Sequence, residues 1–122
     1  MVTVSVEADQ VIFAVEGLDK LWALRSQLTI PAAHIRGVRR GADVEMGLFD
    51  GLKLAGTSVP GLFRAGTFLQ HGDLVFWDVS DRQNAIVVEL EHEHYRQLII
   101  EVADPTAAVQ TIEAAIGVRR VQ

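Results

Sequence analysis

The chain of 122 residues is 49% hydrophobic, and its length fits one compact domain, residues 1–122, with a single core. Sixteen acidic and eleven basic side chains give a formal charge of −5, which disfavours nucleic acid as the main partner because its phosphates are repelled. The absence of cysteine excludes disulfides, cysteine-ligated metals and a thiol nucleophile.

The amino-terminal segment 1–15 carries none of the basic residues that open a secretory signal, since the first basic residue is Lys20. Its densest apolar run, Val11 to Val15, contains five residues, whereas a membrane-spanning helix needs roughly eighteen. We therefore expect a cytoplasmic protein with no transmembrane segment.

Two strands are expected at the start of the chain. Val2, Val4 and Val6 alternate with polar residues, a period that places one row of side chains on a core. The β-branched and aromatic run 11–15 follows after a polar turn, so the two segments predict an antiparallel hairpin.

The next segment changes its period. Residues 18–25 carry apolar side chains at helical spacing and predict a short helical insertion. Alternation returns at Leu28 and Ile30, and residues 34–40 predict a further strand whose apolar residues are out of step. A bulge near Gly37 would restore the register of that strand.

A glycine-rich segment and four regular strands follow. Residues 41–61 contain five glycines without a regular period and predict the longest loop of the chain. Beyond this loop, apolar alternation and polar turns recur at short intervals. The predicted strands are 63–69, 75–79, 86–90 and 98–102.

The last element has clear boundary signals. Asp104 can accept from free backbone N–H groups as the N-cap, and Pro105 suits the first helical position. Gly117 can supply a left-handed C-cap. The apolar residues between these signals form one stripe, which predicts an amphipathic helix over 105–116.

About seven strands followed by one amphipathic helix, without strand–helix–strand alternation, predict a mainly β domain built as a small, bent antiparallel barrel. The helix needs a surface on which to bury its apolar stripe, and an open barrel end provides one. The barrel interior is expected to contain Phe63, Val75, Trp77, Val88 and Ile100.

Five short motifs, taken in their order and spacing, resemble those of bacterial pleckstrin-homology-like (PH-like) domains. The motifs are 56–61 (GTSVPG), 65–68 (AGTF), 76–79 (FWDV), 85–90 (AIVVEL) and 101–105 (EVADP). The resemblance covers mainly residues 56–116. It implies a seven-stranded, strongly bent antiparallel barrel closed at one end by the C-terminal helix, and the insertion at 18–25 departs from the simplest pattern.

Eukaryotic members of that fold often bind phosphoinositide headgroups through lysines and arginines around the first hairpin loop. In this chain the corresponding loop carries Glu7 and Asp9 and no basic residue, so phosphoinositide binding is not expected. The bacterial members share no established common ligand. The resemblance therefore implies a fold and not a function.

The residue types that usually support catalysis do not form a convincing site. Ser58 lacks the strand-to-helix context of a nucleophile elbow, and His71 with Asp73 fits an ordinary hairpin turn. His92 and His94 could hold a metal with a neighbouring carboxylate, but a turn between strands also simply exposes such residues to water. We predict a protein that is not an enzyme and uses no cofactor or metal.

Arg36, Arg39 and Arg40, joined by Arg64, form the one local positive cluster of this acidic sequence. Guanidinium groups suit phosphate or carboxylate, so these four residues are the candidates for ligand binding. The alternative interpretation is a solvated strand end that binds nothing.

Leu21 and Trp22 lie on the predicted helical insertion and are the candidates for a protein interface, since buried aromatic residues are frequent hot spots. Alternatively, Trp22 covers the barrel as part of its core. Trp77 lies on the same alternating row as Val75 and Val79 and is expected to be a core residue.

Two functional hypotheses follow. The first is a non-enzymatic binding or scaffolding module that contacts other proteins or self-associates, through sheet edges or through apolar parts of residues 18–24 and 46–63. The second is a small-molecule or anion-binding domain that uses the arginine cluster or the barrel mouth.

Overall fold

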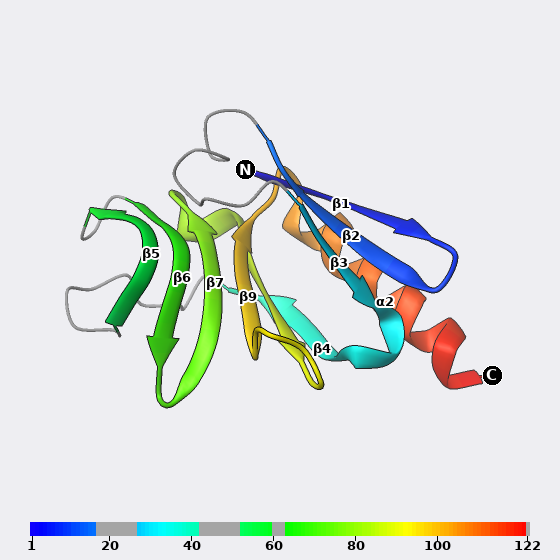
Figure 1. Ribbon diagram of the computed structural model, residues 1–122. Helices are drawn as coiled ribbons and strands as arrows, with labels where there is room; N and C mark the ends of the chain where they lie inside the picture. Colours follow the sequence, from blue (N-terminus) through cyan, green and yellow to red (C-terminus); the bar gives the residue numbers. More distant parts are fainter. Residues whose placement is uncertain (17–26, 42–51, 60–62, 122) are drawn as a thin grey trace.

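The structure of the protein is a computed structural model that describes residues 1–16, 27–41, 52–59 and 63–121 (Figure 1). This part of the chain forms nine strands, two short 3-10 turns and one C-terminal α-helix. The strands are β1 Val2–Glu7, β2 Gln10–Val15, β3 Gln27–Pro31, β4 Ile35–Arg40, β5 Leu52–Val59, β6 Phe63–Gln70, β7 Asp73–Val79, β8 Ala85–Leu90 and β9 Gln97–Glu101. The 3-10 turns are η1 Ala32–His34 and η2 Arg82–Asn84, and the helix is α2 Pro105–Val121. The expected mainly β domain with one C-terminal helix is therefore confirmed.

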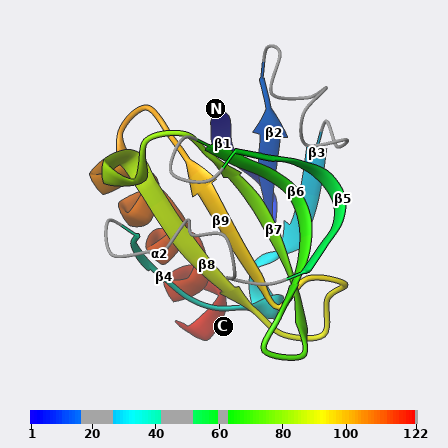
Figure 2. The same ribbon diagram turned by 90° about the vertical axis from the view of Figure 1, so that its left-hand side faces the viewer.

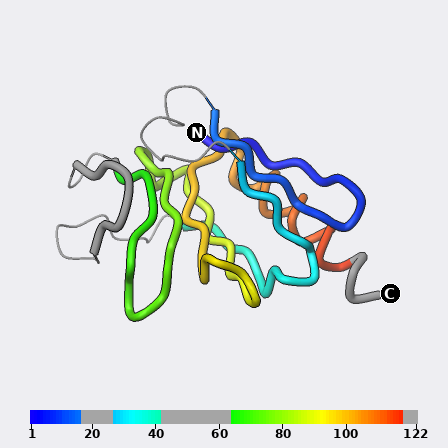
Figure 3. The backbone as a smooth tube through the Cα atoms, viewed as in Figure 1, coloured from blue at the N-terminus to red at the C-terminus, as the bar shows by residue number. Residues whose placement is uncertain are grey.

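The first sheet contains three antiparallel strands in chain order, β1-β2-β3. Its first turn places Ala8 in the left-handed region, at φ 56°, and Glu7 pairs with Gln10 across it. The predicted hairpin is confirmed. Figure 3 shows the chain passing from this sheet through η1 into β4, the first strand of the second sheet. The predicted helical insertion at 18–25 lies outside the described residues.

The second sheet contains six strands in the order β4-β8-β9-β7-β6-β5. Strand β9 pairs antiparallel with β8 and parallel with β7, so the expectation of an entirely antiparallel wall is wrong. The physical reason lies in β9 itself, where Leu98, Ile99 and Ile100 are all buried. A strand with both faces apolar needs a central position, and the place between β8 and β7 supplies it.

The two sheets remain separate, and no closed barrel is found among the described strands. The expected number of about seven strands is also too low, because β5 falls inside the segment 41–61 that was expected to be a loop. Pairing of β5 with β6 shifts register between Lys53 and Ala55. This irregularity interrupts the period of two on which recognition of a strand depends. The remainder of the loop, 42–51 and 60–61, lies outside the described residues.

Two apolar clusters cover the opposite faces of the six-stranded sheet, whose curvature is visible in Figure 2. The larger cluster joins residues of both sheets to Ala108, Ile112 and Ile116 of α2. The smaller cluster contains Phe68, Val75, Trp77, Val79, Ala85, Val87 and Ile99. Central strands of this sheet are therefore buried on both faces.

The expectation of one interior shared by Val75, Trp77, Val88 and Ile100 is wrong. Val88 and Ile100 belong to the larger cluster, whereas Val75 and Trp77 belong to the smaller one on the other face. Parallel pairing sets Trp77 beside Ile99 and so decides which face it occupies. Its expected burial is confirmed, at 2% exposure, and the side chain of Phe63 lies outside the description.

Helix α2 begins as expected, because Asp104 Oδ1 accepts from the Ala107 N–H at 3.1 Å. Ile112 is fully buried and Val109 is partly buried against the larger cluster. The predicted end at residue 116 is wrong, since the helix continues through Gly117 to Val121. A glycine inside a helix costs about 1 kcal/mol relative to alanine, a penalty that does not by itself end a helix.

We predict that Trp77→Ala lowers the free energy of unfolding by about 3–5 kcal/mol, because a buried indole is replaced by a cavity. The variant also loses the hydrogen bond that Trp77 Nε1 donates to Gln70 Oε1 at 2.7 Å. Urea unfolding followed by circular dichroism measures the change. Leu69→Ala, at a position 37% exposed on the neighbouring strand, is the control. Equal losses in the two variants would contradict the assignment of Trp77 to the core.

Candidate functional site

Among the described strands, β1 is an edge of the three-stranded sheet, and helix α2 contacts it. Glu16 N–H donates to the Met1 carbonyl at 2.9 Å, which fixes the alternation of the antiparallel ladder. In an antiparallel pair, every second residue directs its backbone groups toward the partner strand, and Met1 is such a residue. The backbone N–H and C=O groups of Val2, Val4 and Val6 therefore point away from β2. Val2 is only 2% exposed, so the four groups of Val4 and Val6 are the accessible backbone donors and acceptors of the edge.

The other edge strands carry features that discourage pairing with another chain. Strand β4 has a bulge at Arg36 together with two further arginines, and β3 is five residues long and ends in Pro31. Strand β1 has none of these features between Val2 and Val6, and its Thr3 and Ser5 side chains are exposed. Of the edges whose side chains are described, β1 is the best suited to accept an added strand.

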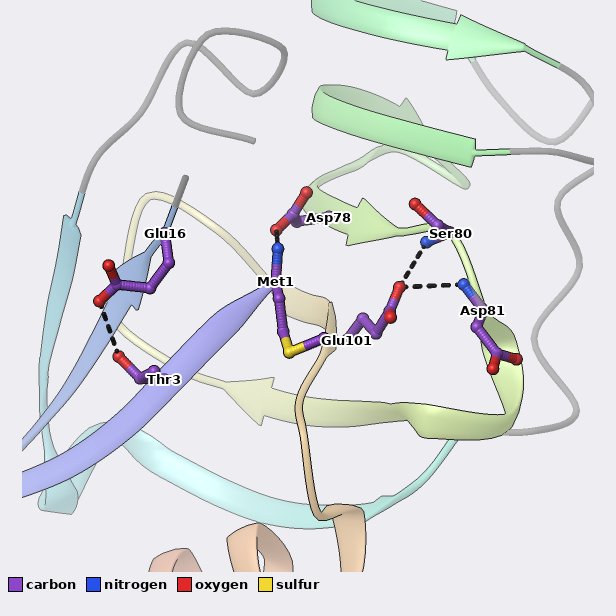
Figure 4. A network of polar contacts seen from close by, with 7 residues as sticks. All are labelled: Met1, Thr3, Glu16, Asp78, Ser80, Asp81 and Glu101. Carbon is purple, nitrogen blue, oxygen red and sulfur yellow. Dashed lines mark hydrogen bonds and ion pairs between the residues drawn. The ribbon is translucent and has the colours of Figure 1, made fainter. Parts of the chain in front are cut away.

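A polar network fixes the beginning of β1 against the second sheet (Figure 4). The Met1 α-ammonium lies 3.2 Å from Asp78 Oδ2 on β7, where the Asp78 side chain is buried. Thr3 Oγ1 donates to Glu16 Oε1 at 3.2 Å, within the first sheet. The edge strand is thus held in place before any partner arrives, which lowers the entropic cost of binding.

Burial raises the pKa of the Asp78 carboxyl, because the charged form loses its hydration. The Met1 α-ammonium opposes this effect, and the Glu101 carboxylate adds to it. Glu101 itself is occupied: its Oε1 accepts from the Ser80 and Asp81 N–H groups at 2.8 and 2.9 Å. The arrangement links three strands, β1, β7 and β9, at one point.

The predicted arginine cluster is divided by the fold. Arg36, Arg39 and Arg40 are exposed on β4, and Arg40 donates to the Gln83 carbonyl at 2.9 Å. Arg64 lies on β6, with β8, β9 and β7 between it and β4 in the sheet. Its guanidinium is buried and stacks on the rings of Phe68 and Trp77, 4.6 and 4.8 Å from their centroids. Arg64 therefore packs as a core side chain.

The bulge in β4 places Arg36 beside an open cavity of about 330 Å³ that Gly37 and Glu89 also line. Glu89 Oε1 accepts from Gln97 Nε2 at 2.7 Å, so the carboxylate is oriented by the adjacent strand. One basic and one acidic residue thus border the same open cavity. Leu21 and Trp22, the predicted interface residues, lie outside the described residues.

The remaining sequence candidates show no catalytic arrangement in the described part of the chain. Ser58 lies within β5, paired with Arg64 on β6, and not on a strand-to-helix turn. His71, at φ 53°, lies in the turn between β6 and β7, and Asp73 begins β7. Among the described residues, no group of three His, Asp or Glu side chains is arranged to hold a metal ion.

Comparison with protein-family models, curated proteins and solved structures finds no match to this chain. Membership of the PH-like family therefore stays a prediction. No helix in the described residues is long and apolar enough to cross a bilayer.

Sequence reasoning missed two contacts that the fold creates over long distances in the chain. One joins Met1 to Asp78, and the other joins His34 Nδ1 to Glu93 Oε2 at 2.5 Å. A polar residue inside the apolar run 74–79 was the available signal for Asp78, because a buried carboxylate needs a partner. The pairing of His34 with Glu93 had no local signal.

We predict that Asp78→Asn changes how stability depends on pH. Because the pKa of Asp78 is raised in the folded protein, the native state takes up a proton before the unfolded chain as pH falls. The stability contributed by this proton is lost as pH rises through the folded pKa. Wild type should therefore gain stability relative to Asp78→Asn between neutral pH and about pH 4.

Urea unfolding at several pH values measures this difference. Asp73→Asn, which removes an exposed carboxylate from the same strand, is the matched control. Parallel pH curves for wild type and Asp78→Asn would contradict the prediction.

Proposed function

We propose that this protein is a non-enzymatic binding module that self-associates by strand addition at the edge of β1. The observation that carries the proposal is the pair of accessible residues Val4 and Val6, whose backbone groups point outward on a strand without charge, proline or bulge between them. Such an edge is a template for another strand. A second copy of the chain presents the same edge and is therefore the natural partner.

A twofold axis through Ser5 gives the register that uses the accessible part of this edge. Val4 then faces Val6 of the second copy, so that each accessible outward donor meets an outward acceptor. Two valines with one N–H and one C=O each give about four bonds between the chains. The two three-stranded sheets become one continuous sheet of six strands.

The side chains that this register brings together are compatible. Ser5 faces Ser5 of the second copy, a pair of hydroxyls that suits cross-strand hydrogen bonding. Glu7 faces Thr3 and not the other Glu7, so like charges are not opposed. Val6, which is 41% exposed in one chain, gains cover from the second copy.

The expected affinity is modest. Each backbone hydrogen bond contributes about 0.5–1.5 kcal/mol net, and association costs translational and rotational freedom. We therefore expect an equilibrium between monomer and dimer that depends on protein concentration. The resemblance to PH-like domains supports a binding module by analogy of fold alone.

We predict that Thr3→Lys/Ser5→Lys abolishes this self-association, because the two substituted residues at position 5 would face each other and the added charges discourage pairing at an edge. Both positions are exposed, but the change at Thr3 also removes its hydrogen bond to Glu16, so circular dichroism checks that the monomer folds. Sedimentation velocity from micromolar to several hundred micromolar protein measures the effect. Wild type should shift toward twice the monomer mass with rising concentration, and the variant should not.

The control is Gln110→Lys/Ala114→Lys, which adds the same two charges at exposed positions of α2. It should associate as wild type does. A wild type that stays monomeric throughout the range, or a control that dissociates as fully as the β1 variant, would refute the proposal.

A second candidate function rests on the cavity lined by Arg36, Gly37 and Glu89. Its two opposite charges suit a small zwitterion such as a free amino acid, whose carboxylate would face Arg36 and whose ammonium would face Glu89. The volume of about 330 Å³ lies at the small end of ligand pockets.

We predict that Gly37→Leu removes such binding by filling the cavity. A Cβ at residue 37 meets no described atom within 4 Å, so a side chain can begin there without a clash. Amide chemical shifts recorded with each of the common free amino acids provide the measurement. Shifts that map away from β4 and β8, or that persist in Gly37→Leu, would exclude this cavity as the site.

A further inference from the structure

Two distant segments meet where η1 leads into β4. The His34 carbonyl accepts from the Glu91 N–H at 2.9 Å, which ties η1 to the turn between β8 and β9. Figure 3 shows this turn beside the segment that leads into β4. The contact places the side chains of His34, His92 and Glu93 in one surface cluster.

The geometry of the cluster is set by two contacts of His34. Its Nδ1 lies 2.5 Å from Glu93 Oε2, and its ring lies 5.8 Å from the His92 ring between centroids, with the planes at 62°. The His34 side chain is 33% exposed and that of Glu93 is 21% exposed. The cluster is therefore accessible from solvent but partly shielded.

The contact with Glu93 selects the tautomer of His34. A carboxylate oxygen accepts, so Nδ1 carries the proton and the lone pair of a neutral ring lies on Nε2. A carboxylate bonded to one ring nitrogen while the other nitrogen binds metal is the usual outer-sphere arrangement of metal-binding histidines. Glu93 thus prepares His34 as a ligand without binding the metal itself.

The separation of the two rings also fits a shared ion. With metal–nitrogen bonds of about 2 Å, two imidazoles on one tetrahedral zinc have centroids about 5 Å apart, close to the observed spacing. His92 is exposed, so its ring can turn a nitrogen toward His34 with little loss of packing. His94 is engaged differently, since its ring lies 4.9 Å from that of the buried Tyr95.

We propose that His34 and His92 bind a divalent transition-metal ion such as Zn²⁺ or Ni²⁺, with Glu93 orienting His34. Imidazole nitrogen suits these borderline ions and not Mg²⁺. Two protein ligands leave the other coordination positions to water or to a donor from another molecule. The affinity should accordingly be moderate, and the ion should clamp η1 to the turn between β8 and β9.

The backbone at His92 decides which substitution and which control are suitable. His92 has φ 60°, in the left-handed region that few non-glycine residues occupy. His71 shares this conformation, at φ 53°, but lies in the hairpin between β6 and β7. It therefore provides a control histidine with the same backbone geometry.

The test is calorimetric titration of the full, untagged chain with ZnCl₂ and NiCl₂, with MgCl₂ as the negative control. His34→Ala and His92→Asn should each weaken binding by at least about tenfold, since each removes one of two ligands; asparagine is chosen because it tolerates the left-handed region. Glu93→Gln should weaken binding by about 10–100-fold, as loss of an outer-sphere partner does.

The matched controls are His71→Asn and His94→Asn, which should bind as wild type does. Because His92 and His71 are both exposed, their variants are expected to fold, and thermal unfolding without metal confirms this. Absence of binding to wild type at millimolar zinc, or equal losses in His92→Asn and His94→Asn, would overturn the proposal.

Discussion

Burial of both faces of the six-stranded sheet is the constraint on which the rest of the fold depends. Strands β7, β8 and β9 carry apolar side chains in both directions, so each face needs its own cover. On one face the cover is supplied by the three-stranded sheet and by Ile112 and Ile116 of α2. The same demand places β9 between β8 and β7, where it pairs antiparallel with β8 and parallel with β7.

The ion pair between Met1 and Asp78 connects this framework to the edge of the molecule. It crosses from the first strand of one sheet to a central strand of the other, at a buried carboxylate. Removal of the ammonium would leave the buried Asp78 carboxylate without its counter-charge, whereas Met1 itself is 43% exposed. The start of β1 is thus positioned by a buried carboxylate of the second sheet.

The local elements were largely predictable from the sequence, because alternation and capping signals act over a few residues. The hairpin of β1 and β2, the bulge before Gly37 and the N-cap at Asp104 are examples. Sheet order was not predictable, since no local period tells β9 to lie between β7 and β8. For the same reason Arg64 was grouped with the arginines of β4, although three strands separate them.

The bulge at Arg36 has a consequence for the size of any assembly. A chain with two open edges can add copies without limit. A chain with one open edge forms a twofold dimer and then has no edge left to pair. Arg36, Arg39 and Arg40 make β4 a poor acceptor, and α2 lies against both β4 and β1. If β1 pairs with a second copy as proposed, the β4 edge does not extend the assembly further.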